Sequence, residues 1–521
     1  MDDTSPVPAR VKRTFLIGPW IARTAIAAGF SFVILTLARF PYDDAFIHLR
    51  IARNLAVHAQ PFFNLGERVM ADSSPLWMVL IAGLFKILPG SGPSSVAVLE
   101  CGIATALLLV VEQYLARVSG RSDAIPLIAA AAVSAMTVQA SGGLMESGLA
   151  LLLLTSAGLA SCNRRTATAG VLFALAAVAR FELCIPAVAA FFLERDKKRM
   201  LVGALPVAML EAALLITVFG TVVPNTIAAK SITFHLTLSE ALDGLPSAFG
   251  IRAAGAVLFA AAAVLAAAIA LRARKELDLA SIVPLALLPV ALLATYVARH
   301  AFVFPWYQPL FTFPAGLAAV AAAMVFPKDR ATLVASRWAL HMLPCVLWGV
   351  AAWGVWSHAL DDVRAVHGRD LTLSHDMAIN ARVLALGKAA ADLADRCPQA
   401  VLMAPEIGAV GWAFPGRIID SCALASPEMF PYFRAGDIVQ GAYGHIPARA
   451  VADFQPDAII GLQVLFSDVA EKAAQFPELA RYRVTARPWF DESFVGFRVP
   501  DEGYFDQTLV VATRMPCAAR L

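Results

Sequence analysis

The chain has 521 residues, of which 59% are hydrophobic and only 16% are charged, and its mean hydropathy is +0.68. A soluble protein of this length would not need so much apolar surface, so the composition predicts a polytopic membrane protein. The formal net charge of +3 is close to neutral and gives no indication of nucleic-acid binding.

The chain begins with a basic segment that is followed by a long apolar run. Arg10, Lys12 and Arg13 precede apolar residues from about 15 to 38. This run is longer than the hydrophobic region of a secretory signal, so we expect an uncleaved membrane helix. Its basic flank predicts a cytoplasmic N-terminus, which would place the next residues on the opposite side of the membrane.

Two adjacent acids, Asp43 and Asp44, follow this first helix in the segment RFPYDDAFIHLRIARNL. Acidic side chains beside a bilayer are costly and are commonly functional, although either acid could simply cap a helix. Neighbouring carboxylates do not both stay charged easily unless a cation lies between them. A divalent metal held by Asp43, Asp44 and His48 is therefore one hypothesis, and a raised carboxylate pKa is the other.

The residues after these acids predict an amphipathic helix on the membrane surface. The segment AFIHLRIARNL has apolar residues at helical spacing and places Arg50 and Arg53 on another face. These arginines can contact lipid headgroups, or they can contact the phosphate of a donor substrate. Glu67 and Arg68 are expected to lie in a turn.

Further apolar runs follow, each near the length that crosses a hydrocarbon core. They cover residues 75–89, 96–116, 124–139, 144–160, 166–194, 199–219, 250–271, 279–297, 305–325 and 336–357. The run 166–194 has Arg180 and Glu182 near its centre and predicts either one span or two half-length spans. An odd total of about 11–13 transmembrane helices would place the residues after 357 outside.

Basic residues between these runs predict the orientation of the helices. The clusters that contain Arg195, Arg272 and Lys328 are expected in the cytoplasm. Counting helices from the N-terminus places Arg117 and Arg164 outside, whereas counting back from the C-terminus can place them inside. The side of these two arginines therefore stays open.

Ionisable residues inside or beside the apolar runs are candidates for a binding site. Glu146 in SGGLMESG, and Arg180 with Glu182 in VARFEL, need charged partners or a polar cavity. They can support the helix bundle, or they can line the site of a donor substrate.

Two expected external loops contain further candidates. Asn225 and Lys230 lie in FGTVVPNTIAAK, and Arg299 and His300 precede FVFPWYQP. A basic residue at such a position can hold a phosphate as a point charge, but interfacial basic residues also extend toward headgroups. Trp306 and Tyr307 of the second loop can belong to an aromatic belt or contact a sugar.

The composition changes near residue 358 to mixed polar and apolar sequence. Short β-rich runs, AVLMAP, GRIID, DAIIGL, RYRVTA, FVGFRV and TLVVAT, alternate with expected helices over 376–394 and 464–476. We therefore expect a soluble α/β domain over residues 358–521. If it lies outside the cell, Cys397 and Cys422 could form a disulfide, but a third cysteine, Cys517, leaves the pairing open.

Three segments resemble a known family. DDAFIHLRIARNL continuing through FNLGERVMADSSPLW, then PNTIAAK, and then APEIGAVGWAFPGRIIDSCALASPE, are similar to loops and tail of membrane glycosyltransferases of the C superfold. Within that group the chain looks most like the mycobacterial terminal arabinofuranosyltransferases. The resemblance implies a transmembrane domain over 1–357 with its first external loop at 39–74, followed by the extracytoplasmic α/β domain.

The resemblance also implies an activity. These families transfer a sugar from a polyprenyl phosphate donor to an acceptor, here a cell-envelope glycan or glycolipid, at the outer face of the bacterial inner membrane. Asp43 or Asp44 would act as general base. The expected donor site contains Lys230, Asn225, Arg299, His300, Arg180, Glu146 and Arg53.

The sequence supports other functions less well. No Gly-rich phosphate loop, zinc-spaced Cys and His set or Ser-His-Asp elbow occurs, so a nucleotide-sugar donor has no predicted site and no cofactor beyond a divalent cation is expected. The alternative is a transporter or lipid flippase, in which the same charges would form a translocation path.

Overall fold

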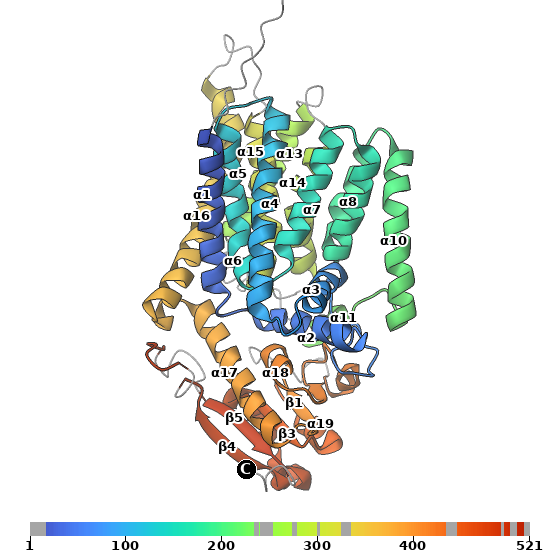
Figure 1. The fold of residues 1–521 in the computed structure, drawn as a ribbon, viewed down its shortest axis with the longest axis vertical. Coiled ribbons are helices and arrows are strands. Elements are labelled where there is room, and N and C mark those ends of the chain that lie inside the picture. Colours follow the sequence, from blue (N-terminus) through green and yellow to red (C-terminus); the bar gives the residue numbers. More distant parts are fainter. Residues whose placement is uncertain are drawn as a thin grey trace, which may run out of the picture.

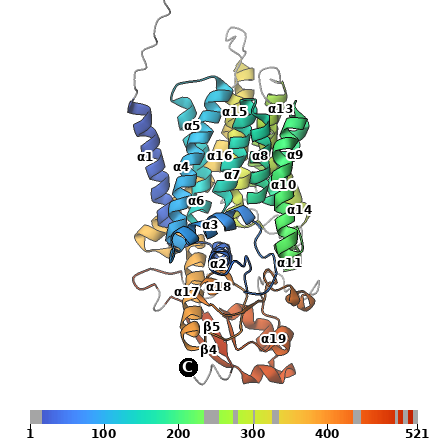
Figure 2. The same cartoon turned by 45° about the vertical axis from the view of Figure 1, so that its right-hand side comes forward.

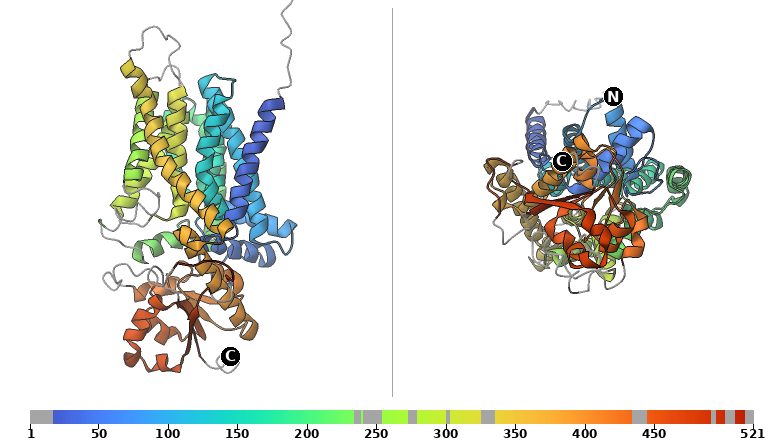
Figure 3. Two further views of the ribbon diagram at one scale, coloured as in Figure 1. Left: turned by 90° about the vertical axis from the view of Figure 1, so that its left-hand side faces the viewer. Right: turned by 90° about the horizontal axis from the view of Figure 1, so that it is seen from below.

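A long helical bundle carries a smaller α/β domain at one end (Figure 1). The computed structural model describes residues 17–233, 239, 254–272, 279–299, 303–324, 335–433, 445–490, 494–500 and 508–514. Seen from below, the α/β domain lies over the end of the bundle (Figure 3).

The bundle contains the apolar runs of the sequence. Its helices are α1 (Ile17–Leu37), α4 (Pro93–Ser119), α5 (Ile125–Ser134), α6 (Val138–Gly142), α7 (Ser147–Cys162), α8 (Thr166–Ala179), α9 (Cys184–Leu193), α10 (Lys197–Phe219), α13 (Ala254–Arg272), α14 (Leu279–Ala298), α15 (Gln308–Met324) and α16 (Ala335–Gly368). Within the described residues, 6 helices are long and apolar enough to cross a membrane. Large apolar side chains on the outside, such as Val202 and Met209, would be costly in water. The chain is thus the polytopic helical membrane protein that its composition predicts.

Two apolar runs differ from simple spans. The run 166–194 is broken at Arg180, whose extended backbone (φ −152°, ψ 121°) separates α8 from the 3-10 turn η2 (Phe181–Leu183) and α9. The two half-length helices of this run were one of the two alternatives. The run 75–89 forms α3 (Pro75–Ile87), which lies beside α2 (Asp43–His58) at the end of the bundle instead of crossing it (Figures 1 and 2).

The two ends of the bundle differ in charge. The loops that join α4 to α5, α7 to α8 and α9 to α10 lie at the end away from the α/β domain (Figure 1). Arg121, Arg164 and Arg195 belong to these loops, and Arg117 lies in the last turn of α4. Arg117 and Arg164 therefore lie at the same end as the basic cluster that precedes α10.

The α/β domain follows α16, which continues past the expected boundary at residue 357 to Gly368. Its strands are β1 (Leu402–Ala404), β2 (Ile418–Asp420), β3 (Ala458–Leu462), β4 (Arg483–Pro488) and β5 (Thr508–Thr513), in the order β2-β1-β3-β5-β4. β1 is parallel to β2 and β3, and β5 is antiparallel to β3 and β4. The helices are α17 (His375–Arg396), α18 (Gly408–Ala413), α19 (Ala448–Phe454) and α20 (Ser467–Glu471).

Short 3-10 turns complete the described elements. They are η1 (Ala135–Thr137), η3 (Pro305–Tyr307), η5 (Leu371–Leu373), η6 (Pro427–Tyr432), η7 (Gln463–Phe466), η8 (Ala473–Gln475) and η9 (Pro477–Arg481). The expected helix over 464–476 is made of such turns and α20, and the run FVGFRV contributes only an isolated bridge between Arg498 and Asp370. The other predicted strands are confirmed.

The α/β domain packs directly on the bundle. One hydrophobic core continues from α1 and α4 into α17 and α18, and the ring of Phe40 contacts the rings of Phe494 and Phe497. Cys397 is disulfide-bonded, whereas Cys422 is a buried free thiol, so these two cysteines, whose pairing the sequence left open, do not bond to each other.

Candidate active site

The helix α2 and its two acids lie between the bundle and the α/β domain. Tyr42 has an extended backbone, and α2 begins at Asp43, so both acids occupy the first helical turn. The positive end of the helix dipole favours carboxylates there. Adjacent side chains of a helix point about 100° apart, so the two acids reach different partners.

Asp43 holds the α/β domain. Its carboxylate oxygens accept hydrogen bonds from the backbone N–H groups of Gly408 (3.0 Å) and Ala409 (2.9 Å), at the start of α18. Burial and the charge of Glu406 raise the pKa of Asp43 to about 7, although the two backbone hydrogen bonds oppose this shift. Asp43 thus joins α2 to α18 and does not face Lys230.

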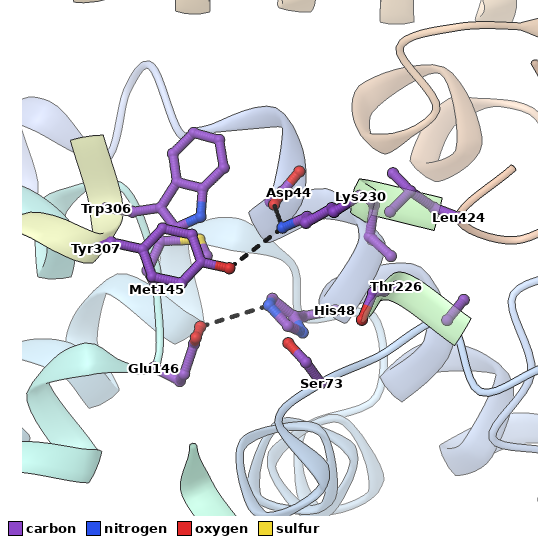
Figure 4. Close-up of a pocket in the computed structure, with 12 residues that line it drawn as sticks. Asp44, His48, Ser73, Met145, Glu146, Thr226, Lys230, Trp306, Tyr307 and Leu424 are labelled. Carbon is purple, nitrogen blue, oxygen red and sulfur yellow. Dashed lines mark hydrogen bonds and ion pairs between the residues drawn. The ribbon is translucent and has the colours of Figure 1, made fainter. Parts of the chain in front are cut away.

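Asp44 points the other way, toward a polar chamber (Figure 4). Its Oδ2 lies 3.8 Å from Nζ of Lys230 on α11 (Asn225–Thr233). Lys230 also donates to the hydroxyl of Tyr307 (3.2 Å) and lies over the ring of Phe304. Burial lowers the pKa of Lys230, but Tyr307 and Asp44 outweigh burial and raise it, so the lysine is charged.

His48 forms a deeper layer of the chamber. Its Nδ1 lies 2.9 Å from the Asp72 carboxylate, and its Nε2 lies 3.4 Å from the Glu146 carboxylate. Burial lowers the pKa of His48, but the two acids outweigh burial and raise it well above 6.5. The two carboxylates thus favour the protonated form of the imidazole, which lies between them.

The proposed metal site of Asp43, Asp44 and His48 is not formed. The three side chains face α18, Lys230 and the Asp72–Glu146 pair respectively. In the part of the chain that the structure describes, no group of three or more His, Cys, Asp or Glu side chains could hold a metal ion. Separate partners, instead of a shared cation, keep the adjacent acids apart.

Arg180 fixes the wall of the chamber. The break between α8 and α9 places its buried guanidinium 2.5 Å from Glu146 and 3.0 Å from Glu182, and 4.4 Å from the ring centre of Tyr307. The three residues support one another, as the first interpretation expects. Glu146 also lines the chamber, and its role toward a donor substrate stays a prediction.

The chamber opens beside a larger and mostly apolar groove. The chamber is lined by Asp44, Ile47, His48, Ala71, Ser73, Met145, Glu146, Thr226, Lys230, Trp306, Tyr307 and Leu424. The groove, of about 240 Å³, is lined by Ser73, Phe181, Glu182, Cys184, Ile185, Thr226, Ile227, Lys230, Leu292, Thr295, Tyr296, Arg299, Phe304 and Tyr307. Lys230 and Tyr307 belong to both, so a charged head group and an apolar chain could occupy the two spaces together.

Two expected donor-site residues, Asn225 and Arg53, line neither the chamber nor the groove. The Asn225 amide donates to the carbonyls of Ala423 and Leu424 (both 2.8 Å) and so holds α11 against the α/β domain. Arg53 lies over the Trp412 ring (4.2 Å) and lines a separate cleft. His300 lies outside the described residues.

The site also contains residues that the sequence alone did not single out. Asp72 pairs with His48, and the only hint was its place in the polar segment ADSSP before α3. Leu424 reaches the chamber from the α/β domain on a loop that Asp420 shapes, because its carboxylate accepts from the N–H groups of Cys422 and Ala425 (both 2.8 Å). The sequence of that loop gives no local signal that it would meet α2.

The helical bundle and the appended α/β domain together form a fold that is already known from a solved structure. A similar solved structure is that of ArnT from Cupriavidus metallidurans bound to undecaprenyl phosphate. It has a TM-score of 0.51 and 13% sequence identity, and the match covers 96% of this chain and 99% of that chain. No protein-family model and no curated protein sequence matches. The similarity to arabinofuranosyltransferases therefore stays a prediction.

Proposed function

We propose that this protein is a membrane glycosyltransferase that takes a sugar from a polyprenyl phosphate donor and transfers it to a hydroxyl of a cell-envelope glycan or glycolipid. The observation that carries the proposal is the junction of the polar chamber with the apolar groove at Lys230 and Tyr307. The parts of a lipid-linked sugar phosphate follow in a matching order: a polar sugar for the chamber, a charged phosphate for Lys230 and an apolar chain for the groove. The similar fold of ArnT, whose structure holds undecaprenyl phosphate, supports this assignment.

The donor phosphate would lie at the junction. Lys230 is a charged side chain common to both spaces, and Arg299 lines the groove. A lysine binds phosphate as a point charge, whereas arginine can add a forked pair of hydrogen bonds. The prenyl chain would follow the apolar side chains of the groove, such as Ile185 and Leu292, toward the bilayer.

Asp44 is the better candidate for the general base. Its carboxylate faces the chamber, whereas the Asp43 carboxylate is engaged by α18. When the donor phosphate takes Lys230, the Asp44 carboxylate is released from this partner and can accept a proton from the acceptor. Asp44 would then accept the proton of the acceptor hydroxyl as the oxygen attacks the anomeric carbon, and the bond to the phosphate oxygen breaks to release polyprenyl phosphate.

The charge of the bundle supports an orientation. Basic loops gather at the end opposite the α/β domain, and cytoplasmic loops are enriched in Lys and Arg. The chamber and the α/β domain would accordingly face the periplasm or the cell exterior, in the bacterial inner membrane.

The test is sugar transfer by the purified full-length protein in nanodiscs. A panel of polyprenyl phosphate sugars is incubated with envelope glycan fragments, using the parent protein, Asp44→Asn and Asp43→Asn. Transfer by the parent that is lost in Asp44→Asn, with donor binding retained, is the expected result. Donor movement across the bilayer without any transfer would refute the transferase and support a flippase, and undiminished transfer in Asp44→Asn would refute its role as base.

A further inference from the structure

A second cleft lies where α2, α17 and α18 meet, apart from the chamber. Its volume is about 400 Å³, and it shares no lining residue with the chamber or the groove. Arg53 and His58 of α2, Asp395 of α17 and Trp412 of α18 line it. α18 packs against both other helices, and α2 lies directly above it (Figure 2). The size of the cleft is within the range of about 300–1,000 Å³ that is usual for small-molecule sites.

One wall of this cleft contains a buried arginine that no acid neutralises. Arg50 is 3% exposed and donates to four backbone carbonyl oxygens, but it forms no ion pair among the described residues. The nearby Glu67 pairs with Arg417 instead. A buried charge is normally paired with an opposite charge, so the positive charge of Arg50 is left to act on the cleft.

Arg53 lies about one helical turn further along α2 and also forms no ion pair among the described residues. Its guanidinium lies 4.2 Å from the ring centre of Trp412 and donates to the carbonyl oxygen of the same residue (3.1 Å). An arginine has five N–H donors, and this is the one hydrogen bond that the described structure gives to Arg53. Trp412 therefore holds the guanidinium in place and leaves donors for a ligand.

The two arginines disfavour each other's charge. Burial and the charge of Arg53 lower the pKa of Arg50 to about 9, and burial lowers the pKa of Arg53. His58 adds a third basic side chain, whereas the acid that lines the cleft, Asp395, is exposed to solvent. An anion bound in the cleft would favour the charged form of both arginines, so the cleft is suited to a negatively charged group.

The other walls of the cleft are apolar. Leu65, Trp412 and Pro415 contribute carbon surface, and Leu65 is 48% exposed. Apolar walls with a few convergent polar groups are typical of sites for small organic ligands, and the C–H face of a sugar ring can pack on such walls. The cleft and the chamber both lie beside α2, and the nine residues from Asp44 to Arg53 span about 13 Å of helix. A short oligosaccharide is long enough to cover this distance.

We infer that this cleft binds an acidic sugar unit of the acceptor glycan, with the carboxylate or phosphate of that unit held by Arg53. The guanidinium can form a forked pair of hydrogen bonds with such a group, and the ring of the sugar packs on the apolar walls. The inference rests on the proposed function and adds the class of acceptor to it, because the bound unit is remote from the hydroxyl that receives the new sugar.

The test measures binding of three probes by calorimetry, using the full-length protein in nanodiscs of neutral lipid without a donor. The probes are a trisaccharide of glucuronic acid, the glucose trisaccharide of the same linkage and glycerol phosphate, which has the anion but no sugar ring. The acidic trisaccharide is expected to bind about tenfold or more tightly than the neutral one, and less tightly as the salt concentration rises. Equal affinities would overturn the inference. Tighter binding of glycerol phosphate than of the acidic trisaccharide would also overturn it, and would assign the cleft to a lipid headgroup.

Variants locate the binding. Arg53→Gln is expected to weaken binding of the acidic trisaccharide by about tenfold or more, because the charge and the fork are removed. Arg449→Gln is the matched control, since Arg449 pairs with Asp453 on α19 and does not line the cleft. An affinity that Arg53→Gln leaves unchanged would contradict the role of Arg53.

An exposed acid gives a test in the opposite direction. Asp395→Asn removes the carboxylate that lines the cleft, so the acidic trisaccharide is expected to bind about twofold or more tightly. This variant changes a solvent-exposed side chain, and it therefore serves if Arg53→Gln fails to fold. A loss of affinity in Asp395→Asn would count against an anion site.

The inference and the proposed function fail in different ways. Sugar transfer to the neutral and the acidic trisaccharide with equal KM, and no preference in binding, would refute the inference and leave the transferase. Binding of the acidic trisaccharide that depends on Arg53, without sugar transfer to any acceptor, would refute the transferase and leave the cleft as a site for an acidic glycan.

Discussion

Asp43 and Asp44 are neighbours in the sequence but have different partners in the structure. The α-helix turns successive side chains by about 100°, so one carboxylate reaches α18 and the other reaches Lys230. The hypothesis of a shared metal assumed that both acids face one space. The helix separates them instead, and each acid acquires its own role.

Substitution of the two acids should therefore have opposite consequences. Asp44→Asn is expected to lower the turnover number by about 10²-fold or more with little change in melting temperature, because it removes the proposed base and only the contact with Lys230. Asp43→Asn is expected to keep turnover within about tenfold and to cost about 1–2 kcal/mol of stability, because it loses one of two hydrogen bonds to α18. Transfer rates at saturating donor and melting curves measure both effects, and the reverse pattern would contradict the assignment.

The pH dependence of stability provides a second prediction at this scale. Asp43 and Asp420 both have pKa values raised by burial to about 7, above the usual value of 3.8. The folded state therefore holds their protons more tightly than the unfolded state does. Their contribution to stability is complete below about pH 4 and is lost as the pH rises through 7, at up to about 1.4 kcal/mol per pH unit for each group.

Melting curves of the purified protein between pH 5 and pH 8 check this dependence. We expect the parent to become less stable as the pH rises, and Asp43→Asn and Asp420→Asn to show a smaller slope, because asparagine does not titrate. A parent that gains stability over this range, or variants that keep its slope, would contradict the raised pKa values.

At the scale of elements, the structure depends on close approach of helices. A Cβ atom at Gly170 of α8 would overlap the backbone of Met200 on α10, and one at Gly203 would overlap the backbone of Ala167. Small residues at a crossing allow two membrane helices to pack through their backbones. This packing supports the break after α8, and therefore Arg180.

Replacement of these glycines should separate the two helices. Gly170→Ala and Gly203→Ala are each expected to lower stability by about 1–3 kcal/mol, because the added methyl group meets backbone atoms that cannot move independently. Gly102→Ala on α4 is the control, since its Cβ would meet nothing within 4 Å, and there alanine should be neutral or stabilising. Melting temperatures in one detergent compare the three, and equal values would argue against tight packing of α8 on α10.

The whole molecule combines a membrane bundle with a domain that completes the chamber. Arg50 of α2 donates to the carbonyls of Phe63, Gly411, Phe414 and Gly416, so the first loop and the α/β domain are fixed together. Leu424 of that domain lines the chamber. The α/β domain is consequently part of the site and not an independent module.

The orientation proposed for the molecule can be tested by labelling. Arg449→Cys, on the exposed surface of the α/β domain, should react with a membrane-impermeant maleimide in intact cells. Arg121→Cys, in the loop before α5, should react only after the membrane is permeabilised. The parent protein gives the background from its own cysteines, and the reverse accessibility would place the chamber in the cytoplasm.

The sequence by itself determined the membrane class, most helix positions, the strands of the α/β domain and several residues of the chamber. Apolar length and period are local properties, and the energetic cost of Glu146, Arg180 and Lys230 near a bilayer marks them wherever they lie. Local sequence could not assign α3 to the bundle end, nor choose between one span and two around Arg180, because both depend on neighbouring helices.

Only the tertiary structure decided which partner each of these side chains contacts. The split between Asp43 and Asp44, the pairing of His48 with Asp72 and the displacement of Asn225 and Arg53 all depend on contacts between segments far apart in the chain. The strength of a hydrogen bond or ion pair decreases within a few ångströms. The partner of a side chain is therefore fixed by the fold and not by the distance along the sequence.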